Sequence, residues 1–144
     1  MNTAKLGRKK EHRERTLRNV ATSLILYEKV ITTEAKAKAV APLVERLIST
    51  SMSGSIAARR SAKALLFDMN AVSKLFDDLS TRANERTSGF VRLTKLPPRL
   101  GDGSAMAEMA LLFPPLEKII EQESKAKVKV RKSTASATTT NDES

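Results

Sequence analysis

The spacing of apolar residues changes at Phe90, and this change limits the folds that the chain can adopt. Up to Leu79, apolar side chains recur every three or four residues, as they do along one face of a helix. From Phe90 to Phe113 they alternate with other side chains, as on a strand with one buried face. A set of helices followed by a strand pair is typical of an α+β fold. A length of 144 residues fits one compact domain with a short tail.

The helical part of the sequence divides into four segments, because Ser53-Gly54-Ser55 and other polar residues interrupt the pattern. Thr33 and Asn70 are predicted to cap the second and fourth helices. The apolar stripe of the second helix is predicted to consist of Ala37, Val40, Val44, Leu47 and Ile48. Pro42 lies opposite this stripe, so its missing N–H faces water and a mild kink is expected. Phe67 and Phe76 are predicted to be core residues. The four helices are predicted over residues 12–27, 34–51, 56–67 and 70–79.

Three short strands are predicted. The β-branched run at 30–33 forms the first, and the segments 90–96 and 105–113 form an antiparallel hairpin with a basic loop. Gly101-Asp102-Gly103 supplies the turn residues of that loop. Residues 80–89 are polar and are predicted to be irregular.

The two ends of the chain differ from its middle in composition. Residues 1–11 are a basic N-terminal extension with little large apolar surface to pack on itself, and residues 12–115 are predicted to be a single globular domain. Residues 116–123 have the composition of a short charged helix. Together with residues 124–144, which are rich in Lys, Ala, Ser and Thr, they make a charged tail over 116–144, and we predict that 124–144 is disordered.

The charge balance predicts a polyanionic partner. Lys and Arg total 26 against 16 acidic residues, a formal net charge of +10, and such a surplus on a small domain favours nucleic acid. Residues 1–20 hold seven basic groups against Glu11 and Glu14, which can pair with Arg15 or Arg18 and withdraw them from a ligand. Residues 82–99 hold five basic groups against Glu85. Two basic segments therefore flank a nearly neutral helical middle.

Several classes of function are disfavoured. The chain has no cysteine and a single histidine, His12, so a metal site is not expected and no cofactor is predicted. The carboxylates show no paired spacing, which gives no support to acid–base catalysis, so an enzyme is not expected. Neither a transmembrane run nor a secretory leader is visible, and we expect a soluble cytoplasmic protein without membrane or small-molecule partners.

Some basic and polar residues have a structural explanation as good as the functional one. His12 and Asn19 share the outer face of the first helix and can form hydrogen bonds to nucleic acid or to backbone, or remain solvated. Arg59 and Arg60 lie on a helix beside Lys63, where a solvated face is at least as good an explanation as RNA contact. The sequence alone leaves these alternatives open.

The order and spacing of motifs resemble the bacterial large-subunit ribosomal protein seventeen family over about residues 5–112. The chain departs from that pattern at its N-terminus, where only MNTA precedes the first motif, at Ala41 and Pro42, and at Ser88–Arg92. The matching residues are KLGR at 5–8, His12-Arg13, Leu17-Arg18-Asn19, Glu28, Ile31-Thr32-Thr33, Lys36-Ala37-Lys38, Glu45, Leu47-Ile48, Arg59-Arg60, Lys74-Leu75-Phe76, Arg86, Gly89, Arg92, Lys95, Arg99, Gly101-Asp102 and Met106-Ala107.

The resemblance implies an α+β fold with several helices packed around a small three-stranded mixed sheet. It also implies a structural role in the large ribosomal subunit, bound to its ribosomal RNA near the exit of the peptide tunnel and beside neighbouring large-subunit proteins. Arginine and lysine contacts to phosphate would hold the protein on folded RNA. The candidate RNA-binding residues are Lys5, Arg8, Lys9, Lys10, His12, Arg13, Arg18, Asn19, Lys36, Lys38, Arg59, Arg60, Arg86, Arg92, Lys95 and Arg99.

Three rival classes fit less well. A DNA-binding protein would need a recognition helix after a tight turn, and residues 53–55 are a poor candidate for that turn. A membrane-surface helix at 12–27 would need more lysine on its polar face and Trp or Phe on the other. An enzyme is the least supported.

Overall fold

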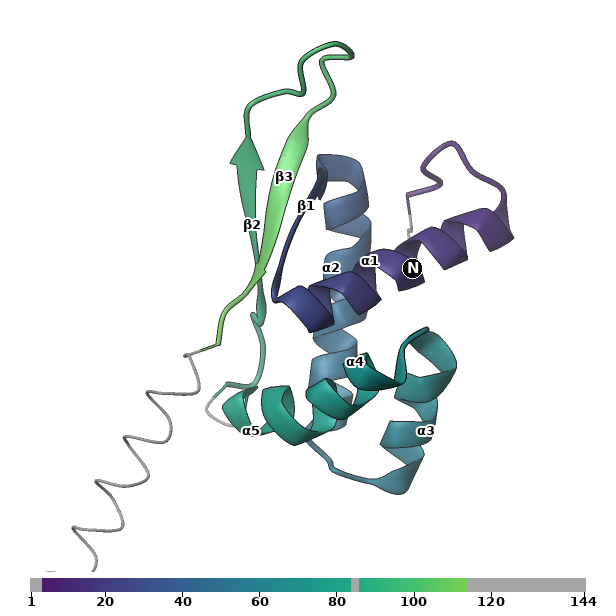
Figure 1. Cartoon of the computed structure of the whole chain (residues 1–144), viewed down its shortest axis with the longest axis vertical. Helices are drawn as coiled ribbons and strands as arrows, with labels where there is room; N and C mark the ends of the chain where they lie inside the picture. The colour runs from purple at the N-terminus through teal and green to yellow at the C-terminus, as the bar shows by residue number, and fades with distance from the viewer. Residues whose placement is uncertain (1–3, 84–85, 114–144) are drawn as a thin grey trace, which may run out of the picture. The chain divides into compact units, whose positions relative to one another are not determined.

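Helices cover one face of a three-stranded sheet in the computed structural model shown in Figure 1. The structure describes residues 4–83 and 86–113, and the predictions for residues 116–123 and 124–144 lie outside these ranges. The elements are α1 (Lys10–Tyr27), β1 (Lys29–Thr33), α2 (Glu34–Ser51), α3 (Ile56–Leu65), α4 (Met69–Lys74), a π-helical segment η1 (Leu75–Leu79), α5 (Ser80–Ala83), β2 (Val91–Leu96) and β3 (Met106–Leu111).

The sheet has the order β1-β3-β2, and both pairings are antiparallel. The predicted α+β class and the β2–β3 hairpin are therefore confirmed, but the predicted mixed sheet is wrong. The strands β1 and β2 do run parallel to each other, yet β3 lies between them and separates them. In register, Met109 of β3 stands opposite Val30 of β1 and Leu93 of β2.

The core forms where α1 and α2 pack against each other and against the sheet. The predicted stripe of α2 is confirmed, since Val40, Val44 and Ile48 are fully buried and its other members are also buried. On the sheet, Ala107 and Met109 are buried beneath these helices. Pro42 lies inside α2 and is exposed, as its place opposite the stripe predicts.

Two predictions at the helix ends are wrong. Helix α3 ends at Leu65, and Leu66 continues in an extended conformation with its side chain buried. Because successive side chains of an extended segment point to opposite sides, Phe67 turns outward and is 56% exposed rather than buried. Helix α4 is capped by Asp68, whose side chain accepts a hydrogen bond from the backbone N–H of Asn70 at 2.8 Å. Thr33 occupies the N-cap position of α2 but makes no side-chain capping bond.

The predicted irregular segment at 80–89 begins as a helix instead. The chain runs from α4 through η1 into α5, and both Arg82 and Ala83 are buried. Arg82 belongs to the second basic segment of the sequence, but the structure places its side chain inside, only 4% exposed. A buried guanidinium requires nearby carboxylates, and the fold supplies two of them.

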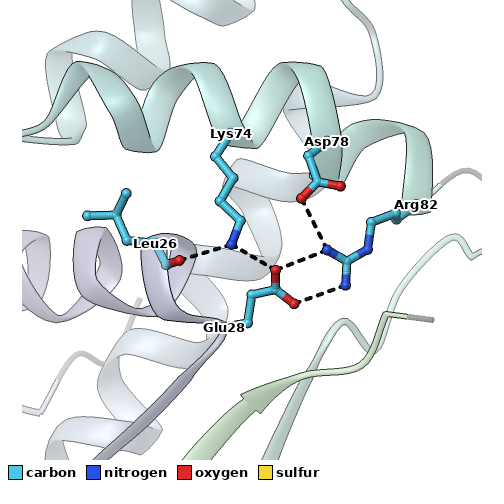
Figure 2. Close-up of polar contacts among 5 residues, drawn as sticks. All are labelled: Leu26, Glu28, Lys74, Asp78 and Arg82. Carbon is cyan, nitrogen blue, oxygen red and sulfur yellow. Dashed lines mark hydrogen bonds and ion pairs between the residues drawn. The ribbon is translucent and has the colours of Figure 1, made fainter. Parts of the chain in front are cut away.

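Glu28 is the centre of this buried charge network, as Figure 2 shows. It is the C-cap of α1 in a left-handed conformation, with φ of 60°, and both its oxygens accept hydrogen bonds from Arg82, at 3.0 and 2.9 Å. Arg82 also contacts Asp78 at 3.1 Å, and Lys74 contacts Glu28 at 2.7 Å and the carbonyl oxygen of Leu26 at 2.9 Å. The network thus ties the junction of α1 and β1 to the α4–η1–α5 segment.

The hairpin is held to the same junction. The backbone N–H of Leu111 donates to the carbonyl oxygen of Glu28 at 2.8 Å, and the guanidinium of Arg82 lies 5.5 Å from the ring centroid of Phe113. That ring lies 5.9 Å from the buried ring of Phe90, centroid to centroid. Aromatic and cation–π contacts of this kind each add modestly to burial.

We expect replacement of Glu28 by Gln to destabilise the fold by roughly 3 kcal/mol, because Arg82 would remain buried with one of its carboxylates gone. Urea unfolding followed by circular dichroism measures this change. The matched control is Glu14→Gln, an exposed carboxylate whose change should leave the unfolding midpoint unaltered. Equal stability of the two variants would contradict the role given to Glu28.

Acid should weaken the fold through the same residue. The hydrogen bonds from Arg82, helped by Lys74, lower the pKa of Glu28 from 4.5 to about 2 against the opposing effect of burial. A depressed pKa stabilises the fold above the unfolded value, and this contribution is lost as pH falls from about 4.5 toward 2. Its size is of the order of 2 kcal/mol for a side chain that is about one-third exposed. The free energy of unfolding should fall more steeply over this range in the natural protein than in Glu28→Gln.

Candidate nucleic-acid interface

The basic N-terminal segment forms a defined turn before α1. Leu6 and Gly7 both have positive φ, 55° and 61°, and the N–H of Arg8 donates to the carbonyl oxygen of Lys5 at 3.2 Å. Leu6 is partly buried and packs against the core. The segment therefore packs on the core of the domain rather than on itself, and this contact positions the neighbouring cations.

A side-chain contact holds this turn against α1. The guanidinium of Arg8 donates to the hydroxyl oxygen of Thr16 at 2.8 Å, and that hydroxyl donates to the carbonyl oxygen of His12 at 2.7 Å. Arg8 is therefore half-buried and directed along the first two turns of the helix. The exposed side chains of His12 and Asn19 lie on the outer face of the same helix, as its periodicity predicts.

The basic side chains of this region are not paired with carboxylates among the described residues. Within the described residues, Glu11 and Glu14 form no ion pair with Arg15 or Arg18, so the pairing considered from the sequence does not occur. We call residues 5–18 the N-terminal basic surface. Its basic residues are Lys5, Arg8, Lys9, Lys10, Arg13, Arg15 and Arg18.

A second group of predicted residues gathers around an open hollow of about 570 Å³. The hollow is lined by Ala4, by the start of α2 and by Ser104 and Ala105 at the base of β3. Lys38 of α2 and Lys95 of β2 both approach Glu34 there, at 2.7 and 3.8 Å. The hydrogen bond from Lys38 lowers the pKa of Glu34, which therefore stays ionised. The fold thus brings the N-terminal segment, α2 and the hairpin together.

Arg99 in the hairpin loop is already paired. Its guanidinium donates to both carboxylate oxygens of Asp102, which also accept bonds from the N–H and hydroxyl of Ser104. The hydrogen bond from Arg99 is the main cause that holds the pKa of Asp102 well below its usual range. The pair shapes the loop, and the Arg99 side chain remains 55% exposed.

The remaining predicted residues lie on separate elements. Arg92 stands opposite Ala110 on the outer face of the sheet, Arg86 is exposed just before β2, and Lys36 is half-buried on α2. On α3, Arg59 pairs with Asp77 at 3.2 Å and lies 5.0 Å from the ring centroid of Phe76, while its neighbour Arg60 is exposed. No ion pair joins these two arginines to the N-terminal basic surface among the described residues.

Sequence reasoning missed two features that shape the interface. The packing of Leu6 had no periodic signal, because a single apolar residue in a basic segment forms no stripe. One weak feature of the sequence indicates that Arg82 is paired: it follows Asp78 by four residues, the spacing at which oppositely charged side chains pair on a helix. Its stronger partner, Glu28, lies 54 residues away and only the fold reveals it.

In residues 4–83 and 86–113, no three His, Cys, Asp or Glu side chains gather as they would to hold a metal ion. No helix in those ranges combines the length and apolar character that a membrane span requires.

The structure thus shows a small α+β protein with cations held in order at its N-terminus. Comparison with known proteins makes this specific: the family described as Ribosomal protein L17 matches residues 16–112. The chain belongs to the ribosomal protein L17 family. It is therefore a structural constituent of the large subunit of the bacterial ribosome, which works in the cytoplasm, and not an enzyme.

Curated relatives agree with this membership, and each of those cited is named large ribosomal subunit protein bL17. The relative from Caldanaerobacter subterraneus subsp. tengcongensis is 43% identical over 112 residues, covering 78% of this chain and 100% of its own. The relative from Koribacter versatilis is 43% identical over 127 residues, covering 88% and 78%. The relative from Solibacter usitatus is 45% identical over 108 residues, covering 75% and 72%.

The contact between Arg8 and Thr16 is expected to keep the N-terminal turn closed. Thr16→Val removes the acceptor, and because such a bond contributes about 1 kcal/mol, the amide of Arg8 should exchange with deuterium roughly fivefold faster. Hydrogen exchange followed by NMR measures this rate. Asn19→Ala on the outer face of α1 is the control and should leave the rate unchanged. An unaltered rate in Thr16→Val would show that Leu6 alone holds the turn.

Proposed function

We propose that the protein binds the ribosomal RNA of the large subunit, with the N-terminal basic surface as its main contact. The observation that carries this proposal is a set of cations held in a fixed turn and on one helix without acidic partners among the described residues. Cations already arranged in this way can contact phosphates without the cost of ordering a free chain. The charge of the whole chain, +10, favours the same ligand.

The hollow beside this surface supports a second set of contacts. Lys38 and Lys95 flank Glu34 beside the hollow. Because two cations share one carboxylate, the group has a net positive charge. Two further cations lie near the hairpin: Arg92 on the outer face of β2, and Arg86 before that strand. Together these residues would hold the protein to folded RNA by its shape and phosphates rather than by its sequence.

The location within the subunit is a further part of the proposal. Family resemblance supports a place near the exit of the peptide tunnel, with neighbouring large-subunit proteins as additional partners. Contacts of this sort would make the protein a clamp for folded RNA during subunit assembly. Neither a small-molecule substrate nor a membrane is part of this proposal.

Reversal of three cations tests the RNA contact. The triple change Arg8→Glu, Lys9→Glu and Lys10→Glu should abolish incorporation into large subunits, because it replaces three attractive charges near phosphate by three repulsive ones. The measurement is sedimentation of tagged protein through a sucrose gradient, followed by a high-salt wash of the large-subunit fraction. Circular dichroism should show that the isolated variant remains folded, since these side chains are exposed or half-exposed.

The matched control keeps the charges and changes the side chains, with Arg8→Lys, Lys9→Arg and Lys10→Arg. This variant should sediment with the large subunit and resist the wash. If the charge-reversed protein incorporated as well as the control, the N-terminal basic surface would not be the RNA contact.

A further inference from the structure

A groove with an apolar floor and a cationic rim lies between α3 and α4, apart from the N-terminal basic surface. It encloses about 250 Å³, and Ile56, Met69 and Val72 line it together with Arg59, Arg60 and Lys63. Ile56 is 74% exposed and Met69 is 55% exposed. Two large apolar side chains are thus held in water at one place, where they could be buried by a partner.

Both exposed side chains are rigidly presented. Ile56 is the first residue of α3, whose N-cap Ser55 accepts a hydrogen bond from the N–H of Ala58 at 3.1 Å. Met69 is the first residue of α4, which Asp68 caps. Because each lies on the first turn of a capped helix, the backbone cannot easily rearrange to bury them internally.

The rim is positive. None of the residues that line the groove is acidic, and Arg60 and Lys63 have no ion-pair partner among the described residues. Arg59 is oriented differently, since Asp77 and the ring of Phe76 hold its guanidinium in place. Arg60 and Lys63, which have no acidic partner among the described residues, therefore lie beside the exposed aliphatic side chains of Ile56 and Met69.

This combination fits a protein better than RNA. Phosphate groups and bases could contact the arginines of the rim, and the Arg59 guanidinium already lies against the ring of Phe76, but neither would gain from the aliphatic side chains of Ile56 and Met69. A protein segment with an aliphatic side chain between Asp or Glu residues would bury the floor and neutralise the rim together. We propose that this groove docks an acidic, aliphatic segment of a neighbouring protein of the large subunit. The inference rests on membership of the subunit and not on the RNA contacts proposed above.

Binding of a synthetic peptide to the full chain is the first test. The probe is an amphipathic peptide with leucines on one face and glutamates beside them, and its matched control has lysines in place of the glutamates. Fluorescence anisotropy should show binding of the glutamate peptide alone. Ile56→Ser should weaken that binding about tenfold, because it removes most of one aliphatic contact. Equal binding of both peptides, or no effect of Ile56→Ser, would overturn the proposal.

Crosslinking within assembled subunits tests the natural partner. The chain has no cysteine, so Ile56→Cys and Asn19→Cys each create a single site for a photoreactive label. At residue 56 the adduct should be sensitive to protease but not to ribonuclease, and it should map to a segment with Asp or Glu beside aliphatic residues. A ribonuclease-sensitive adduct, an adduct on a basic segment, or no adduct at residue 56 would each overturn the groove as a protein site.

The label at residue 19 distinguishes failure of the RNA contact from failure of the groove proposal. It lies on the outer face of α1 and should give an adduct that ribonuclease removes. If residue 19 gave no RNA adduct while residue 56 still crosslinked to an acidic protein segment, the result would contradict the RNA contact and support the groove.

Discussion

The ion pair between Glu28 and Arg82 lies where three parts of the structure meet, and their arrangement depends on it. Glu28 ends α1 in a left-handed conformation, its carbonyl oxygen accepts the N–H of Leu111 in β3, and its carboxylate binds Arg82 of α5. A buried guanidinium that loses one of its two carboxylates is only partly compensated, so the burial of Arg82 in α5 depends on α1 ending at Glu28. One bidentate contact therefore links the helix end, the strand that follows it and the later helices.

Basic residues serve two different purposes in this protein. Arg82, Lys74 and Arg99 are paired with carboxylates and maintain the fold, whereas the cations of the N-terminal basic surface have no such partners among the described residues. A count of charges cannot separate these uses, since both kinds contribute equally to the net value of +10. Their partners separate them, and these partners are mostly distant along the chain. The proposed RNA surface and the proposed protein groove both depend on this distinction.

The predictions that succeeded rest on local periodicity. The stripe of α2, from Ala37 to Ile48, is buried because a helix places every third or fourth residue on one side. Predictions that failed concern places where a neighbour in space overrides the local pattern. Phe67 is predicted to be a core residue, but the end of α3 at Leu65 turns it outward. The segment that contains Arg82 is predicted to be irregular, but it begins as a helix in which Glu28 and Asp78 bind the buried Arg82. The candidate RNA residues could be chosen from charge and motif, while the packing of Leu6 beneath them could not.

The sequence by itself determined the succession of helices and strands, the apolar stripes and the basic segments, because each depends on residues within a few positions of one another. It also determined the family, through the order of short motifs. Only the tertiary structure decided the all-antiparallel sheet with β3 in the centre, the burial of Arg82 against a carboxylate 54 residues away, and the groove between α3 and α4. Each of these depends on which distant segments come together, and a pairing over such a separation leaves no regular spacing in the chain from which it could be predicted.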